Sequence, residues 1–223
     1  MLMAVGDKKK QLFRDTLQAW IGMLDGIKVT GRVGIGIDPG ATGAIGILVE
    51  APALVGVVDI PTYTHTVHRT RFARVKVKTK DGSVRRKRVK KSGPVNTTVF
   101  DLDKIAILFQ VLRPLRKHAV VYLEHPPSTL GPGKAAAELK LREAWAMWPL
   151  FLRGTGWSFQ EPRAFMWKKV CGLTGKKKKN SRDLVNEKWP DLGLTMAKDH
   201  DKAEALLLAE LAMERNQACL VSR

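Results

Sequence analysis

The chain has 223 residues and 44% hydrophobic residues, enough for one domain with a buried core, which excludes disorder along its whole length. Its 39 Lys and Arg against 21 Asp and Glu give a formal net charge of +18, which favours a polyanionic partner: nucleic acid first, anionic membrane second. No apolar run long enough to span a membrane and no secretory signal pattern are visible. We therefore expect a cytoplasmic protein that is not bound to a membrane, with an organelle as the alternative location. Cys171 and Cys219 lack the spacing of a zinc site or a disulfide framework.

Residues 1–31 are predicted to form a helical extension. Apolar residues recur there at helical spacing after a basic cluster, and the segment ends near Gly26. A transit segment is the alternative, but Asp7, Asp15 and Asp25 are atypical of one. We expect one domain over residues 32–216 and a tail over 217–223.

Three short β-prone runs open this domain, at residues 33–37, 45–49 and 54–60, with the spacing of an antiparallel meander. A basic β-hairpin is predicted next, inserted at residues 68–92. Between residues 69 and 91 the chain has twelve Lys or Arg and one acid, Asp81, which together with Gly82 predicts a two-residue turn.

Helices and strands alternate in the second half of the chain. A helix is predicted at 102–115, followed by a buried strand at 119–123. The pattern then predicts further elements, namely helix 135–152, strand 157–160, a short helix from 162, and helices 181–189 and 201–215. Together these elements predict an α/β fold with a mixed sheet.

Two acidic residues directly follow predicted strands. Asp38 begins the turn Asp-Pro-Gly-Ala-Thr-Gly, where glycines would allow a phosphate to approach, although a capped β-turn explains the same letters. The turn also fits the phosphate loop of the actin, Hsp70 and sugar-kinase ATPases. Glu124 ends the run Val-Val-Tyr-Leu-Glu and either reaches solvent or lines a site at the sheet edge.

Asp201 and Glu204 are three residues apart at the head of the last predicted helix, so both carboxylates share one helical face. Like charges this close repel each other, and a bound cation would relieve the repulsion. The alternative is an ordinary acidic first turn. Asp199 or His200 could take the place of Asp201 as the ligand at the start of this helix. Asp201 is preferred because it shares a helical face with Glu204.

A second basic segment precedes the helix predicted at 181–189. Lys176, Lys177 and Lys178 stand before Ser181, which is predicted to cap the helix, and Arg182 follows. Backbone donors at such a helix start suit a phosphate. A solvated surface is the equally favoured alternative.

The order of strand, Asp-Pro-Gly turn, meander, helix, strand with Glu, and terminal Asp-x-x-acid helix resembles the RuvC Holliday junction resolvases of the RNase H-like superfamily. The likeness extends over about residues 33–214. Within it, segments 167–168, 172–173, 178–182, 198–200 and 203–209 are most similar to the chloroplast resolvase of plants and related phage enzymes.

The resemblance implies a five-stranded mixed sheet flanked by helices, a homodimer, and two Mg²⁺ or Mn²⁺ ions per active site. It implies that the metal ligands are Asp38, Glu124, Asp201 and Glu204, with Lys178 facing the scissile phosphate. At the position of Glu204, the resolvases of this family more often have Asp. The implied activity is a structure-selective endonuclease of DNA recombination and repair that makes paired symmetric nicks across a four-way junction.

DNA contacts are predicted on the hairpin and on the loops. The residues are Arg69, Arg71, Arg74, Lys76, Lys78, Arg85, Arg86, Lys87, Arg88, Lys134, Lys176, Lys177, Ser181 and Arg182. Such contacts position DNA without reading its sequence. The alternatives are a broader branched-DNA or RNA/DNA-hybrid nuclease of the same superfamily and a non-catalytic nucleic-acid-binding module. An ATPase is disfavoured because no second phosphate loop is present.

Overall fold

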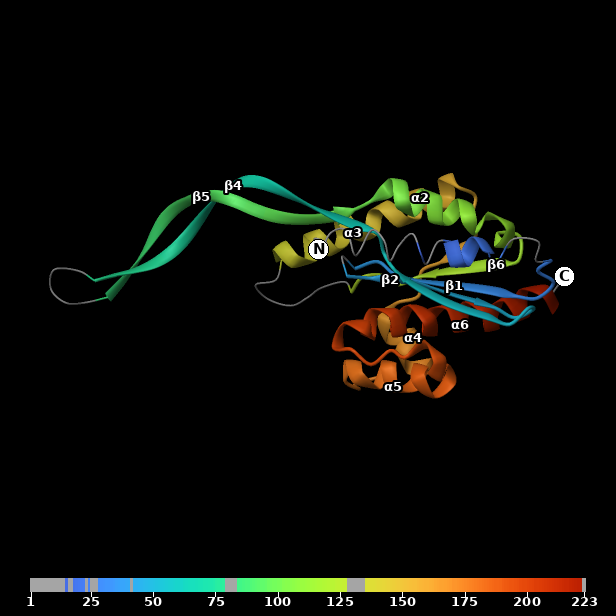
Figure 1. Cartoon of the computed structure of the whole chain (residues 1–223). Helices are drawn as coiled ribbons and strands as arrows, with labels where there is room; N and C mark the ends of the chain where they lie inside the picture. Colours follow the sequence, from blue (N-terminus) through green and yellow to red (C-terminus); the bar gives the residue numbers. More distant parts are fainter. Residues whose placement is uncertain are drawn as a thin grey trace, which may run out of the picture. The chain divides into compact units, whose positions relative to one another are not determined.

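The computed structural model describes residues 15, 18–22, 24, 28–40, 42–78, 84–127 and 135–221. The chain divides into two compact units (Figure 1). The first, the sheet unit, comprises Met1–Pro61 with Leu102–Arg223, and the second, the hairpin unit, comprises Thr62–Asp101.

A five-stranded mixed sheet forms the centre of the sheet unit. Its strands run in the order β3-β2-β1-β6-β7, with β1–β3 antiparallel and β1, β6 and β7 parallel. The strands are β1 (Val33–Asp38), β2 (Ala44–Val49), β3 (Leu54–Asp59), β6 (Ala119–Leu123) and β7 (Phe159–Gln160). The predicted α/β class with a mixed sheet is therefore confirmed, although β7 is shorter than the strand predicted at 157–160.

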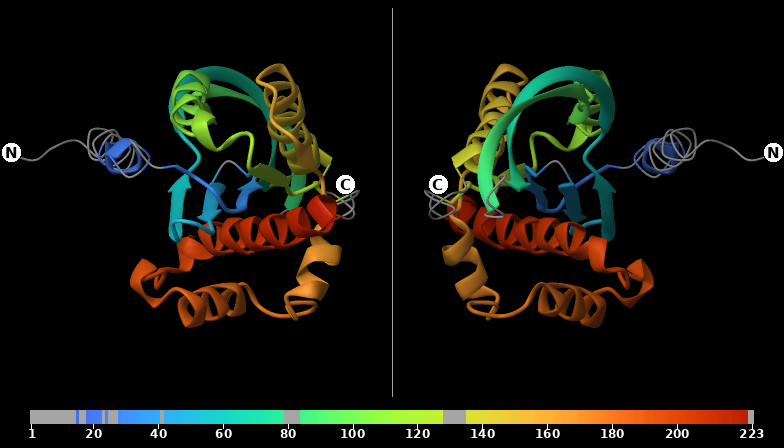
Figure 2. Two further views of the ribbon diagram at one scale, coloured as in Figure 1. Left: turned by 90° about the vertical axis from the view of Figure 1, so that its right-hand side faces the viewer. Right: turned by 90° about the vertical axis from the view of Figure 1, so that its left-hand side faces the viewer.

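Helices cover both faces of this sheet (Figure 2). Helices α2 (Leu102–Val111) and α3 (Ala135–Gly154) lie on one face. Helix α6 (His200–Val221) crosses the other face, and it continues past the end predicted at residue 215. Beyond α6 lie α4 (Ala164–Val170) and α5 (Lys178–Lys188). Short 3₁₀ turns complete the unit at Arg113–Leu115, Pro190–Leu192 and Ala197–Asp199.

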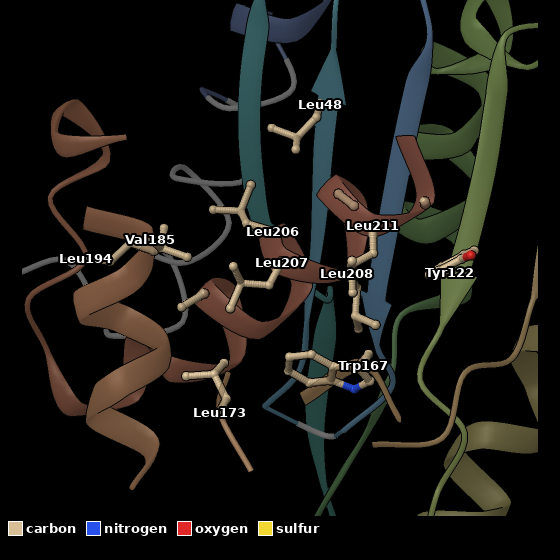
Figure 3. Close-up of a cluster of buried hydrophobic side chains, with 13 residues drawn as sticks. Leu48, Tyr122, Trp167, Leu173, Val185, Leu194, Leu206, Leu207, Leu208 and Leu211 are labelled. Carbon is tan, nitrogen blue, oxygen red and sulfur yellow. The ribbon is translucent and has the colours of Figure 1, made fainter. Parts of the chain in front are cut away.

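Each face of the sheet has its own hydrophobic core. On the α6 side, Leu206, Leu207 and Leu208 are fully buried with Val185 of α5 and Trp167 of α4 (Figure 3). The opposite side contains an aromatic cluster around Phe109. Residues 18–22 are helical, and the indole ring of the buried Trp20 faces Gly56 of β3. No helix in the described part of the chain combines the length and apolar character needed to cross a bilayer.

Glycines in β1 bring α6 unusually close to the sheet. A Cβ atom added to Gly34 would lie 1.9 Å from the carbonyl oxygen of Ala209, and one added to Gly36 would lie 2.0 Å from that of Ala205. Both contacts are with backbone atoms, so the helix itself would have to move. The absence of side chains at these positions therefore sets the distance between β1 and the first turns of α6.

We expect Gly36→Ala to lower the free energy of unfolding by at least about 3 kcal/mol, because the added methyl group overlaps helix backbone that cannot rotate away. Urea unfolding followed by circular dichroism measures this change. Gly154→Ala is the matched control, since nothing lies within 4 Å of its added Cβ atom. Equal unfolding midpoints for the two variants would contradict the proposed role of the close helix contact.

The hairpin unit contains two long antiparallel strands, β4 (Thr62–Lys78) and β5 (Val84–Phe100). They pair without interruption from Thr62 with Phe100 to Lys78 with Val84. The ribbon is longer at both ends than the segment predicted at 68–92. Pairing continues through Pro94, which a two-stranded ribbon tolerates because its strands are both edge strands. The predicted turn at Asp81 and Gly82 lies outside the described residues.

Candidate active site

The carboxyl ends of two neighbouring parallel strands carry the first two acids. Ile37 of β1 pairs with Leu123 of β6, and the N–H of Glu124 donates to the carbonyl of Ile37 at 2.9 Å. Because strand side chains alternate between faces, Asp38 lies on the face of Gly36, which is the face that packs against α6. Glu124 lies in the same register on the adjacent strand, so both carboxyl groups belong to the α6 side.

The first turns of α6 add the other two acids. Ligand oxygens of Asp38, Glu124 and Glu204 all lie within 4.8 Å of one another, although Asp38 and Glu204 are far apart in the sequence. Glu204 is buried, and the other two are half-buried. The sequence predicted that these three acids would lie in one cluster together with Asp201. It gives the described part of the chain a cluster of three carboxylates with the spacing of a metal site.

Asp201 lies beside this cluster with other partners. Its Oδ2 atom accepts a hydrogen bond from Thr42 Oγ1 at 2.9 Å, and its Oδ1 atom lies 2.6 Å from His200 Nε2. Asp199 is engaged elsewhere, because its Oδ2 atom accepts from the N–H of Met196 at 2.8 Å. Asp199 and Asp201 were the two Asp candidates for a ligand at the start of this helix. Of these, Asp201 is the one whose charge raises the pKa of Asp38.

Burial and mutual repulsion raise the pKa of two of these carboxyl groups. Burial, then the charges of Glu124 and Asp201, hold the pKa of Asp38 well above its usual range. Burial and the charge of Glu204 raise the pKa of Glu124 to about 7, against the opposing effects of Lys168 and a hydrogen bond from Trp167. Clustered, incompletely neutralised carboxylate oxygens are the donor set that Mg²⁺ and Mn²⁺ prefer, so the residues fit divalent cations.

Three further residues hold the acids in place, and sequence reasoning assigned them no role in the site. Lys168 Nζ donates to Glu204 Oε2 at 3.0 Å, and Trp167 Nε1 donates to Glu124 Oε1 at 3.2 Å. Both belong to the short helix α4, whose position beside the acids no spacing rule reveals. Thr42 was part of the glycine-rich turn but was not singled out.

The prediction that Ser181 caps α5 is wrong. The helix begins at Lys178, and Ser181 is buried with its hydroxyl group donating to Glu204 Oε1 at 3.3 Å. Its short side chain serves as a hydrogen-bond donor to the acidic cluster instead of satisfying the helix end. Arg182, the next residue, donates to the carbonyl of Thr195 at 2.6 Å.

Lys178 lies at the border of the acidic site. Its Nζ atom contacts His200 Nε2, which in turn neighbours Asp201. Lys176 and Lys177 are exposed on the same segment. Of the other predicted DNA-contacting residues, nine belong to the hairpin unit and Lys134 lies outside the described residues.

Hydrogen bonds within the glycine-rich turn fix its conformation. Gly43 N–H donates to the carbonyl of Gly40 at 2.8 Å, and a Cβ atom on Gly43 would lie 2.0 Å from the carbonyl oxygen of Asp38. Gly40 N–H donates to Asp38 Oδ1 at 3.2 Å. The turn therefore orients the Asp38 carboxyl group, and the glycine at 43 is required for the turn to close.

No protein-family model and no curated protein matches the chain. Among solved structures, the chain is similar to the RuvC structure of Thermus thermophilus, with 17% sequence identity and a TM-score of 0.39. The similarity covers 85% of this chain and 96% of that one.

Proposed function

We propose that this protein is a structure-selective endonuclease that resolves four-way DNA junctions by metal-dependent phosphodiester hydrolysis. The observation that carries the proposal is the convergence of Asp38, Glu124 and Glu204, with ligand oxygens within 4.8 Å of one another. These acids are gathered in a protein of net charge +18, which suits a polyphosphate substrate with a cation between substrate and carboxylates.

The residues have distinct roles in this proposal. Asp38, the last residue of β1, would hold the divalent cations together with Glu124, Asp201 and Glu204. Two Mg²⁺ or Mn²⁺ ions bound there would supply an activated water and charge neutralisation at the leaving oxygen. Lys178, at the border of the cluster, would face the scissile phosphate, and Lys168 orients Glu204 through their 3.0 Å contact.

The junction specificity and the homodimer rest on the motif resemblance described above. Paired nicks across a four-way junction require two active sites related by symmetry, which an isologous dimer provides. Phosphate contacts position DNA without reading its sequence, so selectivity for a branch would come from geometry.

The test incubates the full chain with a labelled four-way junction, a matched linear duplex and an RNA/DNA hybrid, each with Mg²⁺, Mn²⁺ or EDTA. We expect symmetric nicks in the junction, with 5′-phosphate and 3′-hydroxyl ends, and no cleavage in EDTA. Sedimentation of the protein alone and with junction checks for the dimer.

Other outcomes identify the alternatives. Cleavage of the hybrid alone would assign the protein to RNA/DNA-hybrid hydrolysis. Cutting of flaps and forks as well as junctions would indicate a broader branched-DNA nuclease. Salt-sensitive binding without cleavage in either Mg²⁺ or Mn²⁺ would leave a non-catalytic nucleic-acid-binding module.

A further inference from the structure

The register of the hairpin unit sorts its basic residues into two groups. Residues directly opposite each other in an antiparallel pair share a face of the ribbon, and successive residues alternate between faces. From Thr62 with Phe100 to Lys78 with Val84, even-numbered residues pair with even-numbered ones and odd with odd. All even-numbered positions therefore lie on one face, the even face, and all odd-numbered positions on the other, the odd face.

Positive charge on the even face is continuous. Two successive cross-strand pairs there are Arg74 with Arg88 and Lys76 with Arg86. The pairs on either side each add one more cation, so four consecutive pairs contain six cations and no acid. Those six positions are Arg74, Lys76, Lys78, Arg86, Arg88 and Lys90.

On the odd face, apolar residues are paired with two of the cations. Over the same stretch Val77 pairs with Arg85, Val75 pairs with Lys87, and the next pair is apolar. Arg71 and Lys91 follow only after that gap. These four odd-face pairs therefore contain four cations against six in the four even-face pairs, and only one odd-face pair places two cations opposite each other.

Like charges directly opposite each other destabilise a strand pair, and a two-stranded ribbon by itself is marginally stable in water. Two such pairs in succession are thus a cost to the folded hairpin. A polyanion laid along that face would remove the cost, since each phosphate it brings neutralises a cation and releases counterions. The major groove of duplex DNA is wide enough to admit a two-stranded β-ribbon.

We propose that the even face of the hairpin is a docking surface for the phosphate backbone of a duplex DNA arm, and that the odd face is turned away from it. The substrate class rests on the function proposed above, but binding does not depend on the carboxylate cluster. The sequence alone predicts DNA contacts for basic residues of both faces, whereas this proposal assigns phosphate binding to those of the even face.

The experiment compares two full-length variants that each lose four positive charges from one face. The even-face variant carries the changes Arg74→Gln, Lys76→Gln, Arg86→Gln and Arg88→Gln. The odd-face variant carries the changes Arg71→Gln, Arg85→Gln, Lys87→Gln and Lys91→Gln. Fluorescence anisotropy in EDTA measures the affinity for a labelled four-way junction between about 50 and 200 mM salt, a range over which affinity from phosphate contacts falls steeply.

The even-face variant should reduce the slope of log affinity against log salt by about 3 to 4, because each lost phosphate contact removes about 0.9. The odd-face variant should reduce it by less than about 1. Equal losses in the two variants, or a larger loss from the odd face, would overturn the proposal. Thermal unfolding of both variants verifies that the sheet unit is folded.

A third variant with Arg74→Lys, Arg86→Lys and Arg88→Lys keeps every charge and should keep the wild-type slope. Loss of the slope in this variant would also overturn a phosphate-binding role. The outcome is separable from the nuclease proposal. A face-dependent slope without junction cleavage contradicts only the nuclease, whereas cleavage with equal slopes contradicts only this inference.

Discussion

Asp38→Asn should lower junction cleavage by at least about a thousandfold while leaving junction binding unchanged or tighter. The carboxylate is surrounded by the charges of Glu124, Asp201 and Glu204, so we expect it to be the central donor of the proposed cation site. Cation catalysis contributes several kcal/mol to transition-state stabilisation, which corresponds to roughly this factor in rate. Removing a negative charge also lessens repulsion of the DNA phosphates.

Single-turnover cleavage in Mg²⁺ and anisotropy in EDTA provide the two measurements. The fold should be retained, because the Asn Oδ1 atom can still accept from the N–H of Gly40 as Asp38 does. Asp191→Asn is the matched control, an exposed carboxylate outside the cluster, and should cleave at the wild-type rate. Retained cleavage by the Asp38 variant would rule out the acidic cluster as the active site.

Glu124→Gln should stabilise the cation-free protein at pH 8 and have no effect near pH 4. The folded-state pKa of Glu124 is about 7, above its ordinary value of 4.5, so the folded protein binds more protons than the unfolded chain between these values. The free energy of unfolding therefore falls as the pH rises through this window. The shift corresponds to roughly 3 kcal/mol, a loss that the neutral variant does not undergo.

Thermal unfolding in EDTA at several pH values, from 4 to 8, measures the difference between variant and wild type. Gln can still accept the hydrogen bond from Trp167 Nε1, so the change is confined to charge. Glu187→Gln, at an exposed site on α5, should follow the wild type at every pH. Adding Mg²⁺ at pH 8 should stabilise the wild type more than the Glu124 variant. A stability difference that does not grow with pH would refute the electrostatic account.

Much of the site was predictable because it depends on strand alternation and on strand ends. Asp38 and Glu124 each follow a recognisable buried strand, and Glu204 lies three residues after Asp201 on a strongly apolar helix. These are local patterns with a known period. The meander that begins with β1 and the helix that contains Glu204 were likewise recognisable from apolar runs.

Tertiary contacts were not predictable in the same way. Lys168 reaches Glu204 only because α4 packs beside α6, and Ser181 turns its hydroxyl group inward because α5 is seated against α6. A serine after a lysine run satisfies the pattern of a helix cap equally well, so local propensity led to the wrong position. The hairpin was underestimated because Gly93 and Pro94 ordinarily end a strand, whereas a ribbon of two edge strands accommodates them.

The acids come from β1, the end of β6 and the start of α6, and the glycines of β1 allow that last helix to dock. A chain still being translated has β1 and β6 outside the ribosome before residues 200–221 are made. Until then it has a basic surface but lacks two of the four carboxylates. A nascent or prematurely terminated polypeptide therefore cannot assemble the carboxylate cluster on which the proposed nuclease activity depends.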